Sequence, residues 1–195
     1  YWWGNGTSKN RHQEYADFAR SKHSKSLKNL KEKRGKCARE PEETCLQCHS
    51  SDYIMADKSH KPSLSEAREG ITCIVCHESH GMDKNHIRGN SSAHKCEQCH
   101  ADGLSRTTAK SGKPHYPCPV EKVHCADCHM PRIITTGGAF SLRSHAFMII
   151  PPEATEKYQM PNSCQNGGCH DTKGLQWAKK AFNDYYSQQS VQPQE

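Results

Sequence analysis

Four copies of a short pattern rich in cysteine and histidine stand out along the chain. Each copy has the form Cys-x-x-Cys-His, and the copies begin at Cys45, Cys73, Cys96 and Cys125. Two thiols at this spacing can form thioethers with the two vinyl groups of one porphyrin, and the histidine that follows can supply an axial nitrogen to its iron. The pattern therefore predicts four covalently attached c-type haems.

The same pattern assigns the residues of each site. The thioether cysteines are Cys45, Cys48, Cys73, Cys76, Cys96, Cys99, Cys125 and Cys128, and the axial histidines are His49, His77, His100 and His129. A fifth copy, CQNGGCH, runs from Cys164 through Cys169 to His170 and has two extra residues between its cysteines. Glycine reaches backbone conformations closed to other residues, so Gly167 and Gly168 allow the longer loop to bring both sulfurs to one ring. The total expected is five haem c groups.

Paired cysteines have two other common uses. Four pairs could form two tetrahedral zinc sites in a colourless interaction module, but zinc does not explain a histidine after every second cysteine. A disulfide within each pair would close a tight, strained loop. Haem accounts for both the spacing and the histidine, so it is the favoured interpretation.

The elements that position these motifs must be built from a chain with few apolar residues. Its 195 residues are 33% hydrophobic and 7% aromatic, which is low for a globular protein. Such a chain struggles to bury a core made of protein alone, whereas porphyrins would supply apolar interior. We expect a mainly α fold of few short helices and long loops, with little or no sheet and a core of stacked haems. Without haem the protein should not fold.

Helical elements are predicted at both ends of the chain. Apolar residues recur at roughly helical spacing over residues 11–34 and again over 174–187. Gly35 ends the first of these segments. The haem-binding body then occupies residues 37–170. No domain boundary is visible, so residues 1–195 are expected to form one pentahaem domain.

The sequence also predicts where the protein works. No apolar run reaches the length of a transmembrane helix. Haem attachment through thioethers takes place outside the cytoplasm, and the chain begins without Met, as expected for an exported protein that has lost its signal peptide. We expect an extracellular or cell-surface location, with the periplasm as the alternative. In such a compartment the two cysteines outside the motifs, Cys37 and Cys118, are expected to form a disulfide, with buried free thiols as the alternative.

Positive charge is concentrated near the N-terminus. The net charge is +6, and many of the lysines lie between Lys22 and Lys36. This stretch has few aromatic residues and no nucleic-acid-binding motif, so no nucleic-acid partner is expected. A solvated helix face that offsets the haem propionates is the favoured interpretation, and a docking face for an acidic partner is the alternative.

Nine histidines lie outside the five motifs. They are His12, His23, His60, His80, His86, His94, His115, His124 and His145. Five irons with two histidines each need five of them, so the supply exceeds the demand. An iron with two imidazoles has no position left for a substrate, and its chemistry is electron transfer. We therefore expect an electron-transfer protein rather than an enzyme.

Three segments resemble known multihaem cytochromes c. The segment SHKPSLSEAREGITCIVCHESHG resembles their doubled haem module, which implies that His60 and His80 are distal ligands. The segment YADFARSKHSKSLKNL resembles the N-terminal helix of the family that contains the tetrahaem cytochrome of ammonia oxidisers, in which the ligand position falls on His23. Residues 124–187, with CADCHMPR, RSHAF, PNSC and LQWAKKAF, resemble the C-terminal module of multihaem cytochromes with tetratricopeptide repeats, which implies that His145 is a ligand.

The fifth distal ligand is assigned by spacing. His115 precedes the fourth motif at a distance like that of His60 from the second. The expected distal set is then His23, His60, His80, His115 and His145, with His12, His86, His94 and His124 in reserve.

Polymerised extracellular cytochromes are similar to this chain in haem density and sparse secondary structure. The resemblance implies a filament subunit that binds copies of itself, with redox proteins or extracellular acceptors as further partners. A soluble periplasmic carrier is the alternative. The CHMP sequence at residues 128–131 is shared with nitrite and hydroxylamine oxidoreductases, but the Cys-x-x-Cys-Lys motif of the nitrite reductases does not occur. An enzyme with one open haem is therefore the less favoured hypothesis.

Overall fold

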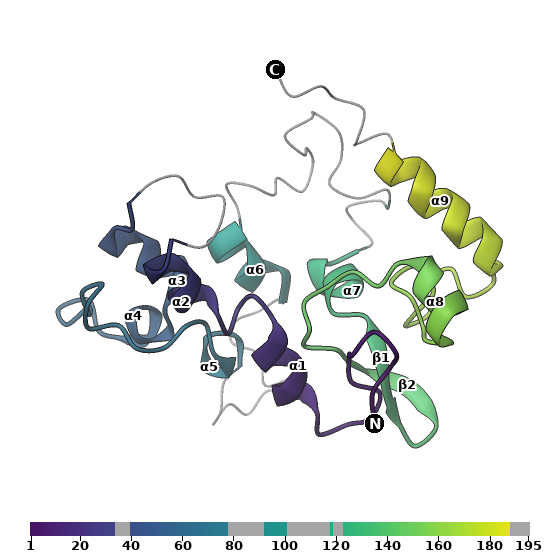
Figure 1. Cartoon of the computed structure of the whole chain (residues 1–195), viewed down its shortest axis with the longest axis horizontal. Helices are drawn as coiled ribbons and strands as arrows, with labels where there is room; N and C mark the ends of the chain where they lie inside the picture. Colours follow the sequence, from purple (N-terminus) through teal and green to yellow (C-terminus); the bar gives the residue numbers. More distant parts are fainter. Residues whose placement is uncertain (34–39, 78–91, 101–117, 119–122, 188–195) are drawn as a thin grey trace. The chain divides into compact units, whose positions relative to one another are not determined.

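The structure is a computed structural model of the whole chain, and it describes residues 1–33, 40–77, 92–100, 118 and 123–187, with the side chains of 92–94, 141 and 187 left out. Short helices joined by turns and loops make up most of this part (Figure 1). They are α1 (Glu14–Arg20), α2 (Ser26–Lys31), η1 (Glu43–Cys45), α3 (Leu46–His49), α4 (Ser51–Met55), α5 (Cys73–Cys76), α6 (Ser92–His100), α7 (Cys125–His129), α8 (Pro152–Tyr158) and α9 (Leu175–Ser187). The predicted fold of short helices and loops is confirmed, while the stacking of haems stays a prediction.

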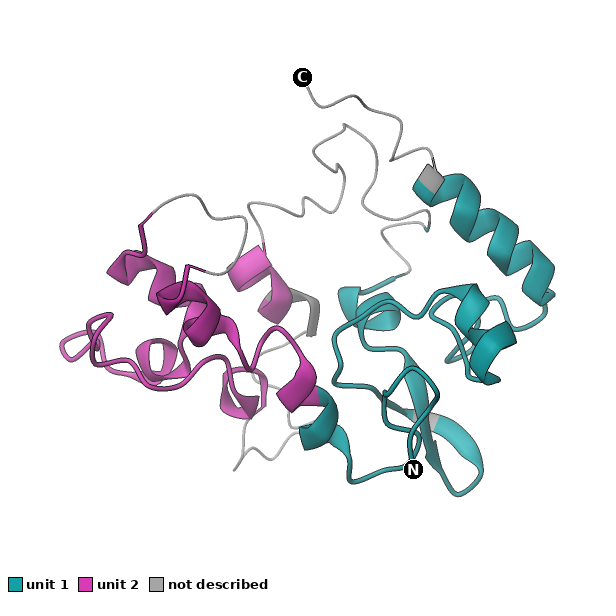
Figure 2. Cartoon of the chain, in the orientation of Figure 1, with its two compact units in different colours: residues 1–17, 102–195 teal, residues 18–101 magenta. Residues whose placement is uncertain are grey.

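The chain divides into two compact units (Figure 2). The first unit comprises residues 1–17 and 102–195, and the second comprises residues 18–101. The second unit therefore holds the first three haem motifs, and the first unit holds the fourth and fifth. That residues 1–195 act as a single haem-linked domain stays a prediction.

The helix predicted over residues 11–34 is wrong in one respect, because it is interrupted. Helix α1 ends at Arg20 and α2 begins only at Ser26. Between them the hydroxyl of Ser24 donates to the carbonyls of Ala19, at 2.9 Å, and Ser21, at 3.1 Å. A serine hydroxyl that donates to backbone carbonyls competes with the amides that would bond to them in a continuing helix. His23 consequently lies in a turn rather than on a helix.

The core of the second unit is small. Leu27, Leu46 and Ala67 are buried in it, and Leu30, Tyr53 and Leu64 are among the partly buried side chains packed around them. Each fully buried leucine contributes roughly 2 kcal/mol. A core of this size agrees with the low hydrophobic content of the sequence.

The first unit contains a β-hairpin that sequence analysis did not predict. Strands β1 (Arg132–Thr136) and β2 (Ala139–Arg143) pair antiparallel. The turn between them is Gly137–Gly138, with φ of 60° and 89°, as a tight hairpin turn with two left-handed residues requires. The expectation of little or no sheet therefore holds only in part.

The hairpin carries the core of the first unit. Ile133 and Ile134 are fully buried in it, and Trp3 from the N-terminal segment is buried against them with 7% of its surface exposed. The indole nitrogen of Trp3 donates to the carbonyl of Ile133 at 3.1 Å, and the amide of Thr135 donates to the carbonyl of Lys9 at 2.8 Å. The N-terminal segment is thus fixed to strand β1 by both apolar and polar contacts.

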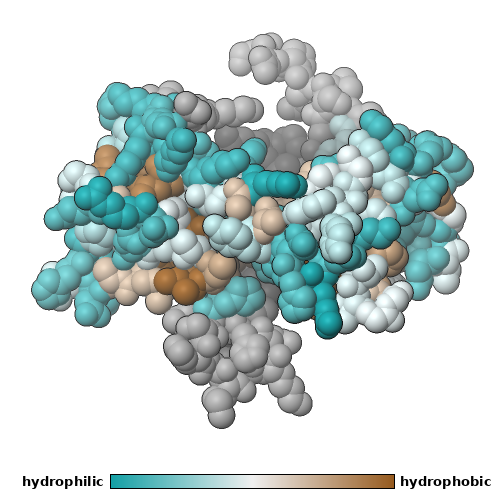
Figure 3. Space-filling model, turned by 60° about the horizontal axis from the view of Figure 1, so that its bottom comes forward, coloured by the Kyte–Doolittle hydropathy of each residue, from teal (hydrophilic) through white to brown (hydrophobic). Residues whose placement is uncertain are grey.

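Apolar side chains also remain at the surface of the described residues. The space-filling view shows hydrophobic residues in small patches on a mostly hydrophilic face (Figure 3). Ile74, inside the second motif, is 43% exposed, and Trp177 on α9 is 40% exposed. Among the described residues, no helix is both long enough and apolar enough to cross a membrane.

Candidate haem sites

Each of the four regular motifs lies on a short helix. The first is split between η1 and α3, the second makes up all of α5 with its histidine just past the end, the third closes α6, and the fourth forms α7. Residues three apart on a helix share one face. One helical turn therefore puts the two cysteines of a pair on the same side, as a single porphyrin ring requires.

The fifth motif forms a turn instead of a helix. Gly167 has φ of 60° and Gly168 has φ of 87°, so both glycines adopt left-handed conformations, as the sequence predicts for the longer loop. Asn162 supports the start of this turn, because its side-chain oxygen accepts the amides of Cys164, at 2.9 Å, and Gln165, at 3.0 Å. The longer loop is thus built on glycine conformation and one asparagine cap.

Cysteines from three different motifs approach one another in the second unit. Burial raises the pKa of Cys99 to about 12, and the neighbouring thiols of Cys48 and Cys76 contribute to this rise. Burial also raises the pKa of Cys76. These partly buried thiols from three motifs lie close together, as closely spaced haems would require.

A similar group lies in the first unit. Burial raises the pKa of Cys128 to about 12, with contributions from Cys118 and Cys164. The pKa of Cys164 is raised to about 11, again first by burial and then by Cys118. Cys118 therefore lies beside the cysteines of the fourth and fifth motifs. Its predicted disulfide partner, Cys37, lies outside the described residues, so the disulfide stays a prediction.

The first motif histidine is oriented by the start of α2. The Nδ1 atom of His49 lies 3.3 Å from the carbonyl oxygen of Ser26, and the Ser26 hydroxyl donates to the carbonyl of His49 at 3.0 Å. When Nδ1 carries the proton and donates it to a carbonyl, Nε2 is left as the metal-binding nitrogen. The contacts of His49 thus fit an axial haem ligand.

A motif histidine and a predicted distal histidine lie close together in the second unit. The rings of His23 and His100 have centroids 5.9 Å apart and planes at 80°. Two imidazoles on opposite sides of one metal have centroids about 6 Å apart, because each metal–nitrogen bond is about 2 Å and each ring adds about 1 Å. Burial, followed by the proximity of His100, lowers the pKa of His23, which favours the neutral imidazole that binds metals.

The remaining predicted distal histidines are placed differently. His145 is half-buried, with its ring 6.1 Å from that of Phe147. His60 is exposed, and its Nδ1 lies 2.9 Å from the hydroxyl of Ser59, so no described contact brings it to a motif. His80 and His115 lie outside the described residues. Among the reserves, His86 and the side chain of His94 also lie outside, while His12 and His124 are exposed.

Sequence analysis missed the polar residues that hold the motifs in place. Arg143 donates to the carbonyls of Ala126, at 2.6 Å, and Met130, at 3.1 Å, and forms an ion pair with Asp127 at 2.6 Å. It thereby fixes α7 and the fourth motif to strand β2. A single sequence carries no signal for this contact, because the partners come together only through the hairpin.

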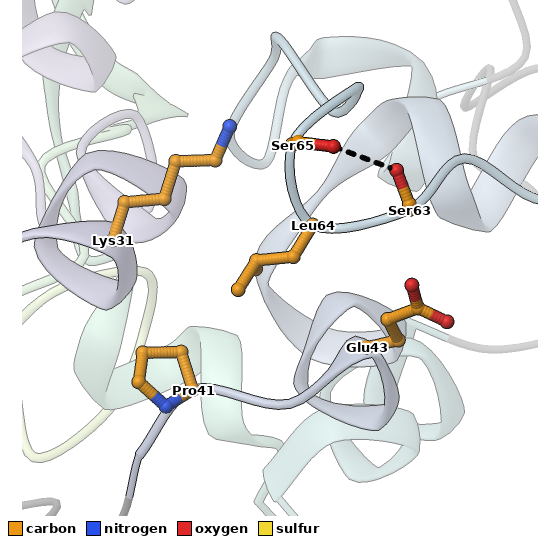
Figure 4. A pocket seen from close by; sticks show the side chains of 6 residues that line it. All are labelled: Lys31, Pro41, Glu43, Ser63, Leu64 and Ser65. Atoms are coloured by element: carbon orange, nitrogen blue, oxygen red, sulfur yellow. Dashed lines mark hydrogen bonds between the residues drawn. The ribbon is translucent and has the colours of Figure 1, made fainter.

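A pocket of about 450 Å³ lies beside the first motif in the second unit, lined by Lys31, Pro41, Glu43 and residues 63–65. Figure 4 shows the side chain of Leu64 between Lys31 and Glu43. The ammonium of Lys31 donates to the carbonyl of Ala67 at 2.7 Å. None of these lining residues belongs to a motif, so the pocket is not a haem site in its own right.

Comparisons with known proteins agree with the motifs. Residues 9–81 match the family model described as cytochrome c554 and c-prime. The fold is similar to that of the outer cell wall cytochrome OcwA, with a TM-score of 0.75 and 24% identity over 96% of this chain and 40% of that one. It is also similar to an undecahaem cytochrome from the S-layer of Carboxydothermus ferrireducens, with a TM-score of 0.52 and 23% identity over 86% of this chain and 31% of that one.

The chain thus spans less than half the length of either structure. No curated protein matches the chain. The repeated motifs and the family match to residues 9–81 indicate a multihaem c-type cytochrome.

Proposed function

We propose that the protein transfers electrons through five c-type haems, each held by two histidines. The observation that carries this proposal is the pair His23 and His100, whose ring centroids lie 5.9 Å apart, close to the separation expected across one iron. His100 is a motif histidine, and His23 comes from a distant part of the chain. Their meeting supports a closed, six-coordinate haem at the third motif.

The proposed ligand set extends this arrangement to the other haems. The motif ligands are His49, His77, His100, His129 and His170, and the distal ligands are His23, His60, His80, His115 and His145. The iron of each haem supplies the redox chemistry when haem is bound. The chain attaches each ring through two cysteines, orients its imidazoles and excludes water.

Close spacing of the haems is supported by the grouping of cysteines. Cys48, Cys76 and Cys99 belong to three motifs, and the thiols of Cys48 and Cys76 lie close enough to Cys99 in the second unit to raise its pKa. In the first unit Cys164, from the fifth motif, lies close enough to Cys128, from the fourth, to raise its pKa. Rings attached at such neighbouring cysteines lie close enough for electrons to pass between them. An oxidoreductase with one open haem is less well supported, because the nine histidines outside the motifs exceed the five that closed haems would need.

We further propose that the protein works at the cell surface or outside the cell, as a subunit of a cytochrome filament. OcwA is described as an outer cell wall cytochrome, and the second similar structure comes from an S-layer. The partners are then other copies of the chain, together with redox proteins or extracellular acceptors. A periplasmic carrier is the alternative. Negative-stain electron microscopy of the native holoprotein separates the two, because a filament subunit gives continuous fibres and a carrier gives only small particles.

Carbon monoxide binding to the reduced holoprotein tests the ligand set. The wild type should bind essentially none, because each iron has two histidine ligands. The variant His23→Ala should bind one carbon monoxide per chain. Lys22→Ala, which changes an exposed neighbouring residue, is the matched control and should behave as the wild type. Stoichiometric binding by the wild type would show an open haem and contradict the proposal.

A further inference from the structure

A buried carboxylate contacts the segment that carries His145. Asp17, on α1, is 1% exposed. Its Oδ1 atom accepts hydrogen bonds from the amide and the hydroxyl of Ser8, both at 2.8 Å, and its Oδ2 atom accepts one from the hydroxyl of Ser144 at 2.7 Å. A buried carboxylate is costly unless it is fully hydrogen-bonded. Three short bonds from neutral donors indicate a site that fixes the position of each donor.

Ser144 transmits this constraint to its neighbour, His145. Its amide donates to the carbonyl of Pro131 at 3.0 Å, and its hydroxyl accepts the amide of Ala146 at 3.2 Å. The residues on both sides of His145 are therefore held in place. Ser144 is held through its backbone and its side chain, and Ala146 is held through its amide. Pro131 follows the fourth motif by two residues, so the same contacts tie His145 to that motif.

We propose that Asp17 is a positioning residue for the axial ligand His145, acting through the hydroxyl of Ser144. The proposal rests on the proposed role of His145 as a distal haem ligand. Metal-binding histidines commonly depend on outer residues that fix the orientation of the ring. Here the outer residue acts on the backbone of the ligand rather than on its ring, and it comes from the opposite end of the chain.

The alternative is that Asp17 serves only to anchor the N-terminal segment through Ser8. The two halves of its hydrogen bonding can be separated by substitution. Ser8→Ala removes the hydroxyl bond to the N-terminal segment and leaves Ser144 untouched. Ser144→Ala removes the bond to the His145 segment and leaves Ser8 untouched. The two serines are both fully buried, with exposures of 0% and 1%, so the variants are closely matched.

The experiment measures carbon monoxide binding to the reduced holoprotein of each variant. His145→Ala should bind one carbon monoxide per chain. Asp17→Ala and Ser144→Ala should both bind carbon monoxide, because the displaced His145 dissociates from iron more readily. Ser8→Ala should behave as the wild type.

Three results would overturn the proposal. If His145→Ala binds carbon monoxide but Asp17→Ala and Ser144→Ala do not, Asp17 has no positioning role. If Ser8→Ala binds as much as Ser144→Ala, the effect is general loosening of the unit. If His145→Ala itself binds none, His145 is not a ligand, and the positioning role of Asp17 is refuted with it. The pairing of His23 with His100 is still tested separately by His23→Ala. Should Asp17→Ala not yield folded protein, Ser144→Ala and Ser8→Ala decide the question by themselves.

Discussion

The fifth haem motif should depend on one glycine more than on any other. Gly167 has φ of 60°, and a Cβ atom added there would lie 3.0 Å from Cδ of Arg132. The left-handed conformation costs a non-glycine residue about 1–2 kcal/mol, and crowding a packed site costs about 1–3 kcal/mol more. The amide of Arg132 donates to Asn166 at 2.8 Å, so the backbone that carries the obstructing side chain is held in place. Gly167→Ala should therefore destabilise the motif by about 2–5 kcal/mol, adding the two effects.

Two other glycines provide matched controls. Gly168 has φ of 87° but open space where an added Cβ atom would lie, so Gly168→Ala should cost only the backbone strain of about 1–2 kcal/mol. Gly174 has open space and no left-handed φ, so Gly174→Ala should be close to neutral. The three substitutions are chemically identical and differ only in conformation and contact.

The assay is the mass of the intact holoprotein chain, which reports the fraction of molecules that carry a fifth haem. This fraction should fall in the order wild type and Gly174→Ala, then Gly168→Ala, then Gly167→Ala. Equal haem content in all four proteins would refute the reasoning, because neither strain nor contact would then matter. A larger loss for Gly168→Ala than for Gly167→Ala would show that the contact with Arg132 has no effect.

Three further predictions concern the residues around the other motifs. Ser26→Ala should shift the reduction potential of one haem in a spectroscopic titration, because the Ser26 hydroxyl donates to the carbonyl of His49 and accepts the amide of Ile71 at 3.0 Å. The control Ser65→Ala changes an exposed serine whose hydroxyl pairs with that of Ser63 and should leave every potential unchanged, so equal shifts in the two variants would contradict the assignment. Arg143→Ala should lower the temperature at which the holoprotein loses its native haem spectrum, because three polar contacts to α7 are lost; an unchanged temperature would show that these contacts do not hold the fourth motif. Protein made in cells unable to attach haem should lack the helical circular dichroism of the holoprotein, because the two protein cores are small, and a folded haem-free chain would contradict this.

The motifs and the C-terminal helix could be predicted from sequence because both depend on local spacing. The cysteines of each regular pair stand three residues apart, which a single helical turn accommodates, and α9 spans Leu175–Ser187 against a prediction of 174–187. The conformations of Gly167 and Gly168 were also predictable, since no other residue adopts them easily. In each case the deciding interaction lies within a few residues of the motif.

The helix break, the hairpin and the histidine pair were not predicted, each for a different physical reason. The break before Ser26 arises because a serine hydroxyl replaces backbone bonds, and the apolar spacing on either side does not reveal it. The hairpin does carry a local signal, a β-branched run before Gly137 and Gly138, but the short strands are hard to distinguish from loop without their partners. The meeting of His23 with His100 depends on the packing of a whole unit, so spacing alone could not identify the pair.

Two histidine ligands on every iron are the basis of the proposed electron transfer. Near-infrared magnetic circular dichroism of the oxidised holoprotein tests this ligation most directly, because the charge-transfer band of ferric haem reports the identity of both axial ligands. With the signal quantified per chain, we expect five low-spin haems, all with two histidine ligands. A high-spin haem, or a low-spin haem with another second ligand, would contradict the proposal.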